Sequence, residues 1–77
     1  MSRLPRITAK DLTRAVEKLG FVYARQKGSH AVFKHQDGRR TTISIHPGKI
    51  IGPGLLRKII DKDLEISKEG FVKVLRK

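Results

Sequence analysis

A chain of 77 residues is too short to close two hydrophobic cores, so we expect a single domain over residues 1–77. The lack of cysteine excludes disulfide frameworks, thiolate metal sites and cysteine nucleophiles. Eighteen Lys and Arg residues against seven Asp and Glu give a formal net charge of +11, which favours a polyanionic partner.

The residues after the basic N-terminus indicate the compartment. Polar residues such as Thr8, Lys10 and Asp11 stand where a secretory signal would have an apolar stretch. No segment reaches transmembrane length, and the basic residues are spread along the chain instead of lying on one amphipathic helix. We therefore expect a cytoplasmic location and no membrane partner.

A first helix is predicted between Thr8 and Gly20. Thr8 is a good N-cap, and glycine is a common helix end. Leu12, Val16 and Leu19 fall on one face of the helix between them.

Three short runs rich in β-formers come next, at residues 21–26, 29–35 and 39–46. Lys27-Gly28 predicts a tight turn between the first two runs, and Asp37-Gly38 is a two-residue hairpin signal between the second and third. The pattern predicts an antiparallel meander of three strands. Alternation of Ile43 and Ile45 with polar residues indicates that one face of the sheet meets the core and the other meets water.

A second helix is expected to cover the apolar face of this sheet. Residues 47–52 are predicted to form a loop, and Pro53 suits the first turn of a helix that continues to Leu64. Ser67 is a candidate N-cap for a short C-terminal helix around Phe71, although Gly70 disfavours it.

The predicted order is α-β-β-β-α with a short C-terminal helix, an α+β fold with a three-stranded antiparallel sheet and helices on one face. The double-stranded-RNA-binding domain has the same order. A shared order is an analogy of fold and assigns no function.

Positive charge concentrates in the predicted sheet. From residue 20 to residue 49 one acid, Asp37, stands against six basic residues, which are Arg25, Lys27, Lys34, Arg39, Arg40 and Lys49. This excess predicts a phosphate-binding surface on the strands and their turns. The C-terminal half mixes basic and acidic residues, as an ordinary solvated helical surface does.

Three histidines lie in or beside the strands, and histidine is the usual proton-transfer group at neutral pH. His30 follows Gly28-Ser29 and is close in sequence to Arg25 and Lys27, which could steer a phosphate to it. His35 and His46 stand at strand ends. Because an isolated histidine more often has a structural role, the residues alone leave His30 as a candidate.

Other chemistries fit the sequence less well. Three histidines without a recognised ligand spacing disfavour a zinc site, and the lone acid of the sheet disfavours a magnesium site. Ser29 and His30 are neighbours on a strand, so their side chains diverge and cannot form a nucleophile–base pair. The glycines near Pro53 lack the spacing of a nucleotide-binding loop. RNA cleavage is still compatible with these residues. A ribose 2′-hydroxyl can attack the adjacent phosphate with help from one base and nearby cations.

The chain resembles the HicA toxin family of bacterial mRNA interferases. The matching residues span about Thr8 to Leu75 and are Leu19-Gly20-Phe21, Arg25-Gln26-Lys27-Gly28-Ser29-His30, Phe33, His35, Asp37-Gly38, His46-Pro47-Gly48-Lys49 and Pro53-Gly54-Leu55-Leu56. The Gly-Ser-His step with an aromatic residue three positions later is the most specific part. Ile50 and Ile51 stand where relatives are often more polar.

This resemblance implies a double-stranded-RNA-binding-domain-like fold and a toxin that arrests translation by cleaving mRNA. The residues themselves predict that this cleavage needs no metal or other cofactor. The resemblance implies that His30 is the catalytic residue, whereas His35 carries no role and His46 is at most auxiliary. It also implies a HicB-type antitoxin, with the toxin monomeric alone or part of a hetero-oligomer. The residues expected to bind RNA are Lys27, Gly28, Ser29, Arg39, Arg40 and Lys49.

A non-catalytic RNA-binding module is the alternative that composition alone would favour. It would use the same basic sheet and turns but would not cleave RNA. The two hypotheses differ in the role of His30, so RNA cleavage by the parent chain and by a His30→Ala variant separates them.

Overall fold

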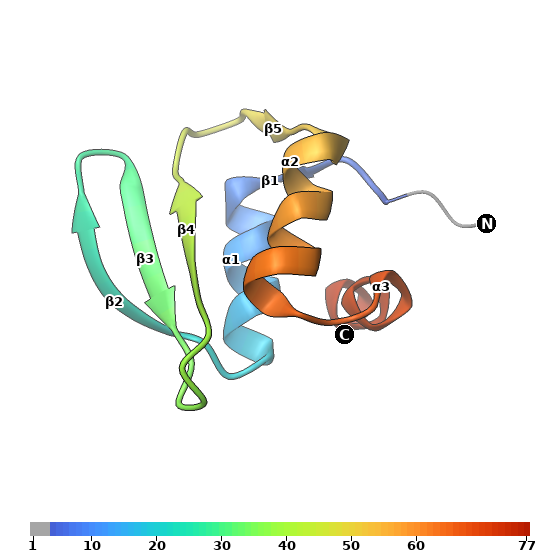
Figure 1. Ribbon diagram of the computed structural model, residues 1–77. Coiled ribbons are helices and arrows are strands. Elements are labelled where there is room, and N and C mark those ends of the chain that lie inside the picture. The colour runs from blue at the N-terminus through green and yellow to red at the C-terminus, as the bar shows by residue number, and fades with distance from the viewer. Residues whose placement is uncertain (1–3) are drawn as a thin grey trace.

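A computed structural model describes residues 4–77 and has two antiparallel sheets with helices packed against them (Figure 1). In chain order the elements are β1 (Ile7–Thr8), α1 (Ala9–Lys18), β2 (Val22–Lys27), β3 (His30–Lys34), β4 (Arg40–Ser44), β5 (Ile50–Ile51), α2 (Pro53–Lys58), the π-helix η1 (Ile59–Leu64) and α3 (Lys68–Arg76). The α+β class and the three-stranded sheet β2-β3-β4 confirm the sequence prediction.

A capping box begins α1. The Asp11 backbone N–H donates to Thr8 Oγ1 at 3.2 Å, and the Thr8 N–H donates back to Asp11 Oδ2 at 3.1 Å. The Thr8 backbone N–H, and then the Thr8 hydroxyl, lower the pKa of the Asp11 carboxyl below its ordinary value. The cap therefore contributes stability above that ordinary value and loses it as the pH falls through the lowered pKa. Leu12, Ala15 and Val16 form the buried face of the helix.

The turn between β2 and β3 has two residues. Lys27 pairs with His30, and Gly28 and Ser29 connect them. Gly28 has a φ of +59°, a left-handed conformation that glycine adopts without a Cβ clash. The tight turn predicted from Lys27-Gly28 is therefore present.

The loop between β3 and β4 is one residue longer than its sequence signal predicts. The His35 N–H donates to the Arg39 carbonyl at 2.8 Å, and the Gly38 N–H donates to the His35 carbonyl at 3.0 Å, so three residues separate the last pair. Gly38 has a φ of +100°. A type I turn followed by a left-handed glycine is the usual geometry of a three-residue hairpin loop, and the two-residue prediction was wrong.

A β-bulge interrupts β2 at Ala24. Tyr23 pairs with Phe33 and Arg25 pairs with Val32, which leaves Ala24 without a partner on β3. Because side chains alternate along a strand, this extra residue sets the face on which every later β2 side chain lies.

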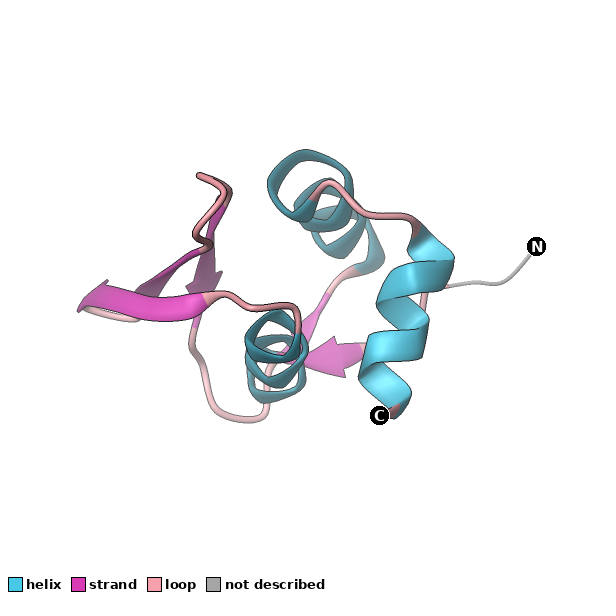
Figure 2. Cartoon of the chain, turned by 90° about the horizontal axis from the view of Figure 1, so that it is seen from below, coloured by secondary structure: helices cyan, strands magenta, loops and turns pink. Residues whose placement is uncertain are grey.

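The helices separate into two layers beside the sheet. In Figures 1 and 2, α1 and α2 lie between the three-stranded sheet and α3. Both α1 and η1 contact β4, and α3 contacts α1. The core is almost entirely apolar and consists of Ile7, Ala9, Leu12, Ala15, Val16, Phe21, Ala31, Phe33, Ile43, Leu56, Ile59, Ile60, Leu64 and Phe71.

Two features near α2 differ from the sequence prediction. Ile50 and Ile51 were expected in a loop, but they form β5 and pair with Thr8 and Ile7 of β1. The second predicted helix ends its α-helical part at Lys58 and continues as η1. The β1–β5 pair has only two residues on each strand, which is too few for an alternating pattern to be recognised in the sequence. Ile7 of β1 is buried in the core.

The C-terminal helix α3 is present despite Gly70. The Gly70 N–H donates to Ser67 Oγ at 2.9 Å, so the glycine lies in the capped first turn and not in the helix interior. Phe71 is fully buried against α1 and the core. No helix within residues 4–77 combines the length and the apolar character that crossing a bilayer requires.

Candidate nucleic-acid interface

His30 lies on the face of the sheet that is turned away from the buried strand residues. Ala31 and Phe33 of β3 are buried, and His30 and Lys34 are exposed, as alternation along a strand requires. Cross-strand partners share a face, and the register places Lys27 and Ser44 on either side of His30. These three residues form the first row of what we call the outer face.

Two further rows complete the outer face. Arg25 and Thr42 flank Val32 in the second row, and Val22 and Arg40 flank Lys34 in the third. The bulge at Ala24 is responsible for the cations of β2: without the extra residue, the side chains of Arg25 and Lys27 would alternate to the opposite face. The outer face therefore carries four cations, which are Arg25, Lys27, Lys34 and Arg40.

The Gly28-Ser29 turn is held to both neighbouring strands. The Ile45 N–H donates to the Ser29 carbonyl at 2.6 Å, and the Gln26 side-chain amide donates to the Gly28 carbonyl at 3.0 Å. These bonds fix the backbone from which His30 projects. Gly28 and Ser29 thus position the histidine, and the exposed Lys27 is its neighbour across the turn.

Next to His30 the surface is hollowed. A cavity of about 240 Å³ is lined by His30 and Ser44 of the sheet, by Leu55 and Ile59 from the second predicted helix, and by the buried Leu12 of α1. On this second helix Leu55 is 54% exposed, whereas its neighbour Leu56 is fully buried.

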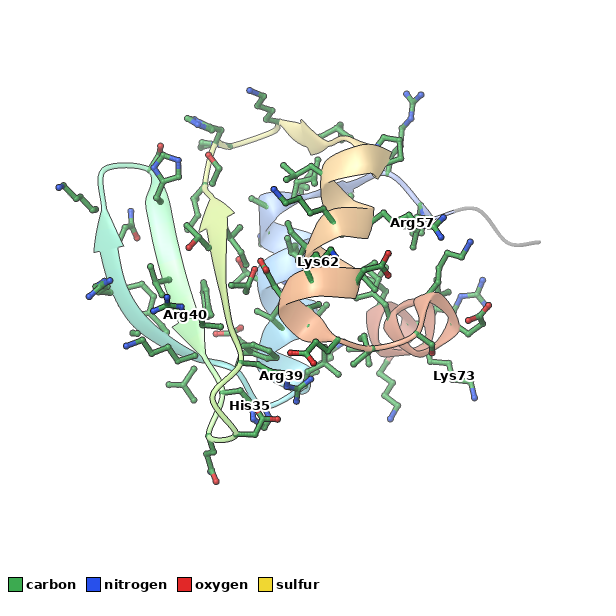
Figure 3. All side chains as sticks on the ribbon, viewed as in Figure 1. His35, Arg39, Arg40, Arg57, Lys62 and Lys73 are labelled. Atoms are coloured by element: carbon green, nitrogen blue, oxygen red, sulfur yellow. The ribbon has the colours of Figure 1, made fainter. Side chains whose placement is uncertain are left out.

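Two of the predicted RNA-binding cations flank this hollow region from opposite ends. Lys49 shares a second hollow with Ser44 and Leu55, and its N–H donates to the His46 carbonyl at 3.1 Å, which closes the turn before β5. Arg40 lies in the third row of the outer face, four residues along β4 from Ser44. Figure 3 shows the Arg40 side chain over the strands and clear of the hairpin loop.

Arg39, also predicted to bind RNA, lies elsewhere. Its Nε donates to Asp37 Oδ2 at 2.8 Å, its Nη1 donates to the Leu64 carbonyl, and its guanidinium lies 5.3 Å from the centre of the Phe21 ring. Figure 3 shows Arg39 and His35 together at the hairpin end of the sheet. The Arg39 backbone N–H, and then its side chain, lower the pKa of the Asp37 carboxyl. Arg39 thus joins the hairpin loop to the end of η1, at the opposite end of the strands from His30.

His35 packs in the same cluster and is not close to His30. Its ring meets Phe21 edge to face at 5.1 Å. Gly20 approaches the other side of the ring so closely that an added Cβ would lie 2.9 Å from His35 Nε2, and its φ of +100° also requires glycine. These contacts give His35 a packing role.

His46 lies in a different hollow from His30. That hollow is formed by α1 residues such as Lys10 and Arg14 together with Ile45 and the His46–Gly48 segment. The structure therefore brings Lys27, Gly28, Ser29 and His30 together, places Lys49 and Arg40 at either end of the adjoining hollows, and separates the other two histidines from this region.

Some residues of the interface were not selected from the sequence. Strand alternation could have placed Lys34 on the same face as His30, but Arg25 required knowledge of the bulge. Leu55 and Lys58, which line a further hollow with Arg40, had no signal of their own. They come from an amphipathic helix whose exposed residues depend on how it packs. Within residues 4–77, no three His, Cys, Asp or Glu side chains gather in a group that could hold a metal ion.

The comparisons with known proteins identify a family. The family model described as HicA toxin of bacterial toxin-antitoxin matches residues 9–66, which include the outer face, the Gly28-Ser29 turn and α2. A search of curated proteins found no match. Since the matched segment covers most of the 77 residues, the chain belongs to the HicA toxin family of bacterial toxin–antitoxin systems.

Proposed function

We propose that this toxin is a metal-independent endoribonuclease that cleaves mRNA with His30 as its catalytic residue. The observation that carries the proposal is the position of His30: it is exposed, it stands in one row with Lys27 and Ser44, and it shares its face with further cations. When a ribose 2′-hydroxyl attacks the adjacent phosphate, a base must take its proton and nearby cations must stabilise the negative charge.

The reaction needs few protein groups. His30 takes the proton from a ribose 2′-hydroxyl as that oxygen bonds to the adjacent phosphorus, and the bond from phosphorus to the 5′ oxygen of the next nucleotide breaks. The leaving 5′ oxygen takes up a proton from water, and His30 returns its proton to the solvent, so the products are a 2′,3′-cyclic phosphate and a 5′-hydroxyl. Lys27, directly across the strand pair, stabilises the negative charge of the phosphorane.

RNA cleavage is expected to continue in EDTA and to weaken steeply with salt. If three to five of the cations Arg25, Lys27, Lys34, Arg40 and Lys49 contact phosphates, the log–log slope of RNA affinity against salt is about −2 to −3.5. Labelled RNA incubated with the purified chain, with and without EDTA and between about 50 and 200 mM salt, measures both effects. Strict dependence on magnesium would contradict the mechanism.

A non-catalytic RNA-binding module is the second candidate, since the cations of the outer face fit it equally well. It predicts the same salt dependence and intact RNA at the end of the incubation. Salt-dependent binding without any cleavage product would therefore favour the module over the nuclease.

Membership of the HicA family implies an antitoxin partner. We expect a HicB-type antitoxin to present an acidic surface to the outer face and the loop from residue 47 to residue 54, and so to cover His30. The C-terminal helices carry acids such as Asp61, Glu65 and Glu69 and attract such a surface less. Co-expression with the neighbouring reading frame and amide-exchange mapping test this. Protection confined to α3, or failure to co-purify, would contradict it.

A further inference from the structure

Three hollows beside β4 and α2 share lining residues, and we treat them as one groove. Leu55 lines all three, Ser44 lines the hollow of Lys49 and the hollow of His30, and Thr42 lines the hollow of His30 and the hollow of Arg40. We call this the α2 groove. It runs from Lys49 at one end, past His30 in the middle, to Arg40 and Lys58 at the other end. In Figure 1, α2 runs beside β4 with α1 behind them both.

The two ends of the α2 groove are cationic. Lys49 stands at the first end, and Arg40 and Lys58 stand at the second. Asp63 is the acid that lines the groove within residues 4–77, and its Oδ2 accepts a hydrogen bond of 2.8 Å from the Thr41 hydroxyl. The groove therefore has three cations against one acid, and its ends are positively charged. This charge favours a polyanion as the ligand.

Between these ends α2 presents one exposed apolar side chain, because Leu55 is 54% exposed whereas Ile59 is buried. Ile50 of β5, in the hollow of Lys49, is 48% exposed. Exposed aliphatic side chains near cations suit a single nucleic-acid strand, whose bases have apolar faces and whose phosphates are charged. Ser44, which lines the hollows of Lys49 and His30, is four positions along β4 from Arg40, or about 13 Å, so a short oligonucleotide spans this part of the groove.

On the basis of the proposed nuclease function, we infer that the RNA strand lies along the α2 groove as it passes His30. Lys58 and Arg40 contact backbone phosphates on one side of the cleaved bond, and Lys49 contacts them on the other. Leu55 packs against a base next to that bond. Lys58 and Leu55 are thus substrate-positioning residues contributed by α2, in addition to the outer face of the sheet.

The neighbouring cation Arg57 provides a matched control for Lys58. Arg57 is on the same helix but lines none of the three hollows, and it lies 3.5 Å from the Asp61 carboxylate one turn later. Figure 3 shows Arg57 on the side of α2 that faces away from β4. Replacing either residue by glutamine removes one charge from the same short helix. Lys58→Gln changes the groove, whereas Arg57→Gln changes the opposite surface and removes the exposed ion pair with Asp61.

The test uses a fluorescent 2′-O-methyl RNA oligonucleotide, which cannot be cleaved because its 2′ oxygen carries no proton. Lys58→Gln should weaken binding about fivefold at about 0.1 M salt and make the log–log salt slope about 0.7 less steep, as loss of one phosphate contact does. Arg57→Gln should leave the slope of the parent chain unchanged. Leu55→Ala should weaken binding severalfold without changing the slope, because it removes apolar contact and no charge.

Equal slopes for Lys58→Gln and Arg57→Gln would overturn the inferred path. Loss of antitoxin affinity in Lys58→Gln and Leu55→Ala with RNA binding unchanged would also overturn it and would assign the groove to the protein partner. A different result tests the proposed nuclease function: if the parent chain leaves an ordinary RNA intact, that function is contradicted. A parent that cleaves RNA while Lys58→Gln and Arg57→Gln behave alike contradicts the path alone.

Discussion

Replacement of His30 by alanine is expected to slow RNA cleavage by about 10²–10⁴-fold, the usual contribution of a positioned proton-transfer group. The loss is expected to fall on the chemical step, because the cations that hold the phosphates are untouched. His30 is exposed at the end of β3, so the variant should fold as the parent does. Single-turnover cleavage of a labelled RNA measures the rate, and circular dichroism checks the fold.

His46→Ala is the matched control for this experiment. His46 is also exposed and near the sheet, but it lines the hollow beside α1 and not the one beside His30. Its replacement should leave the cleavage rate within a few-fold of the parent. Cleavage by His30→Ala at the parent rate, or loss of activity in both variants, would contradict the assignment of proton transfer to His30.

The main elements of the fold could be predicted because each has a local signal. Thr8 caps α1, Pro53 begins α2, Ser67 caps α3, and the strands are β-rich runs separated by glycine turns. The β1–β5 ribbon could not be predicted, since two residues on each side pair only through contacts distant in sequence. The length of the loop before β4 depends on Asp37 and Arg39, whose side chains and backbone fix it jointly.

The centre of the candidate site could also be predicted, but its extent could not. Gly28, Ser29 and His30 are consecutive, so their proximity follows from the sequence. Arg39 and Arg40 are consecutive as well, yet strand alternation sends Arg40 to the outer face and Arg39 toward Phe21 and the end of η1. A count of charges by segment does not separate two such neighbours.

The contribution of α2 to the site depends on tertiary packing. In the sequence Leu55 and Leu56 are equivalent apolar residues of an amphipathic helix. In the structure Leu56 enters the core and Leu55 stands at the rim of the groove, because the helix lies beside β4 and not squarely over the sheet. The position of a helix relative to a sheet edge has no local signal, and the function of its exposed residues follows from that position.

Replacement of Phe71 by alanine is expected to lower the free energy of unfolding by about 3–5 kcal/mol, the usual cost of a buried Phe→Ala change. Phe71 is fully buried, and α3, which carries it, packs on α1 beyond the segment that matches the family model. Lys18 Nζ adds a polar link between the two helices by donating to the Val74 carbonyl at 3.4 Å. A domain of this length has a total stability of roughly 4–12 kcal/mol, so the variant should lose a large part of it.

Thermal unfolding followed by circular dichroism measures this loss, which corresponds to a fall in Tm of about 12–40 °C for a domain of this size. Lys73→Ala is the control on the same helix, since Lys73 is exposed and its side chain points away from the core (Figure 3). Its Tm should stay within a few degrees of the parent. If both variants melt together near the parent Tm, then α3 does not stabilise the domain, and its contact with α1 is not part of the cooperative core. If Phe71→Ala alone is destabilised, α3 belongs to the same cooperative core as α1, whose Leu12 lines the hollow beside His30.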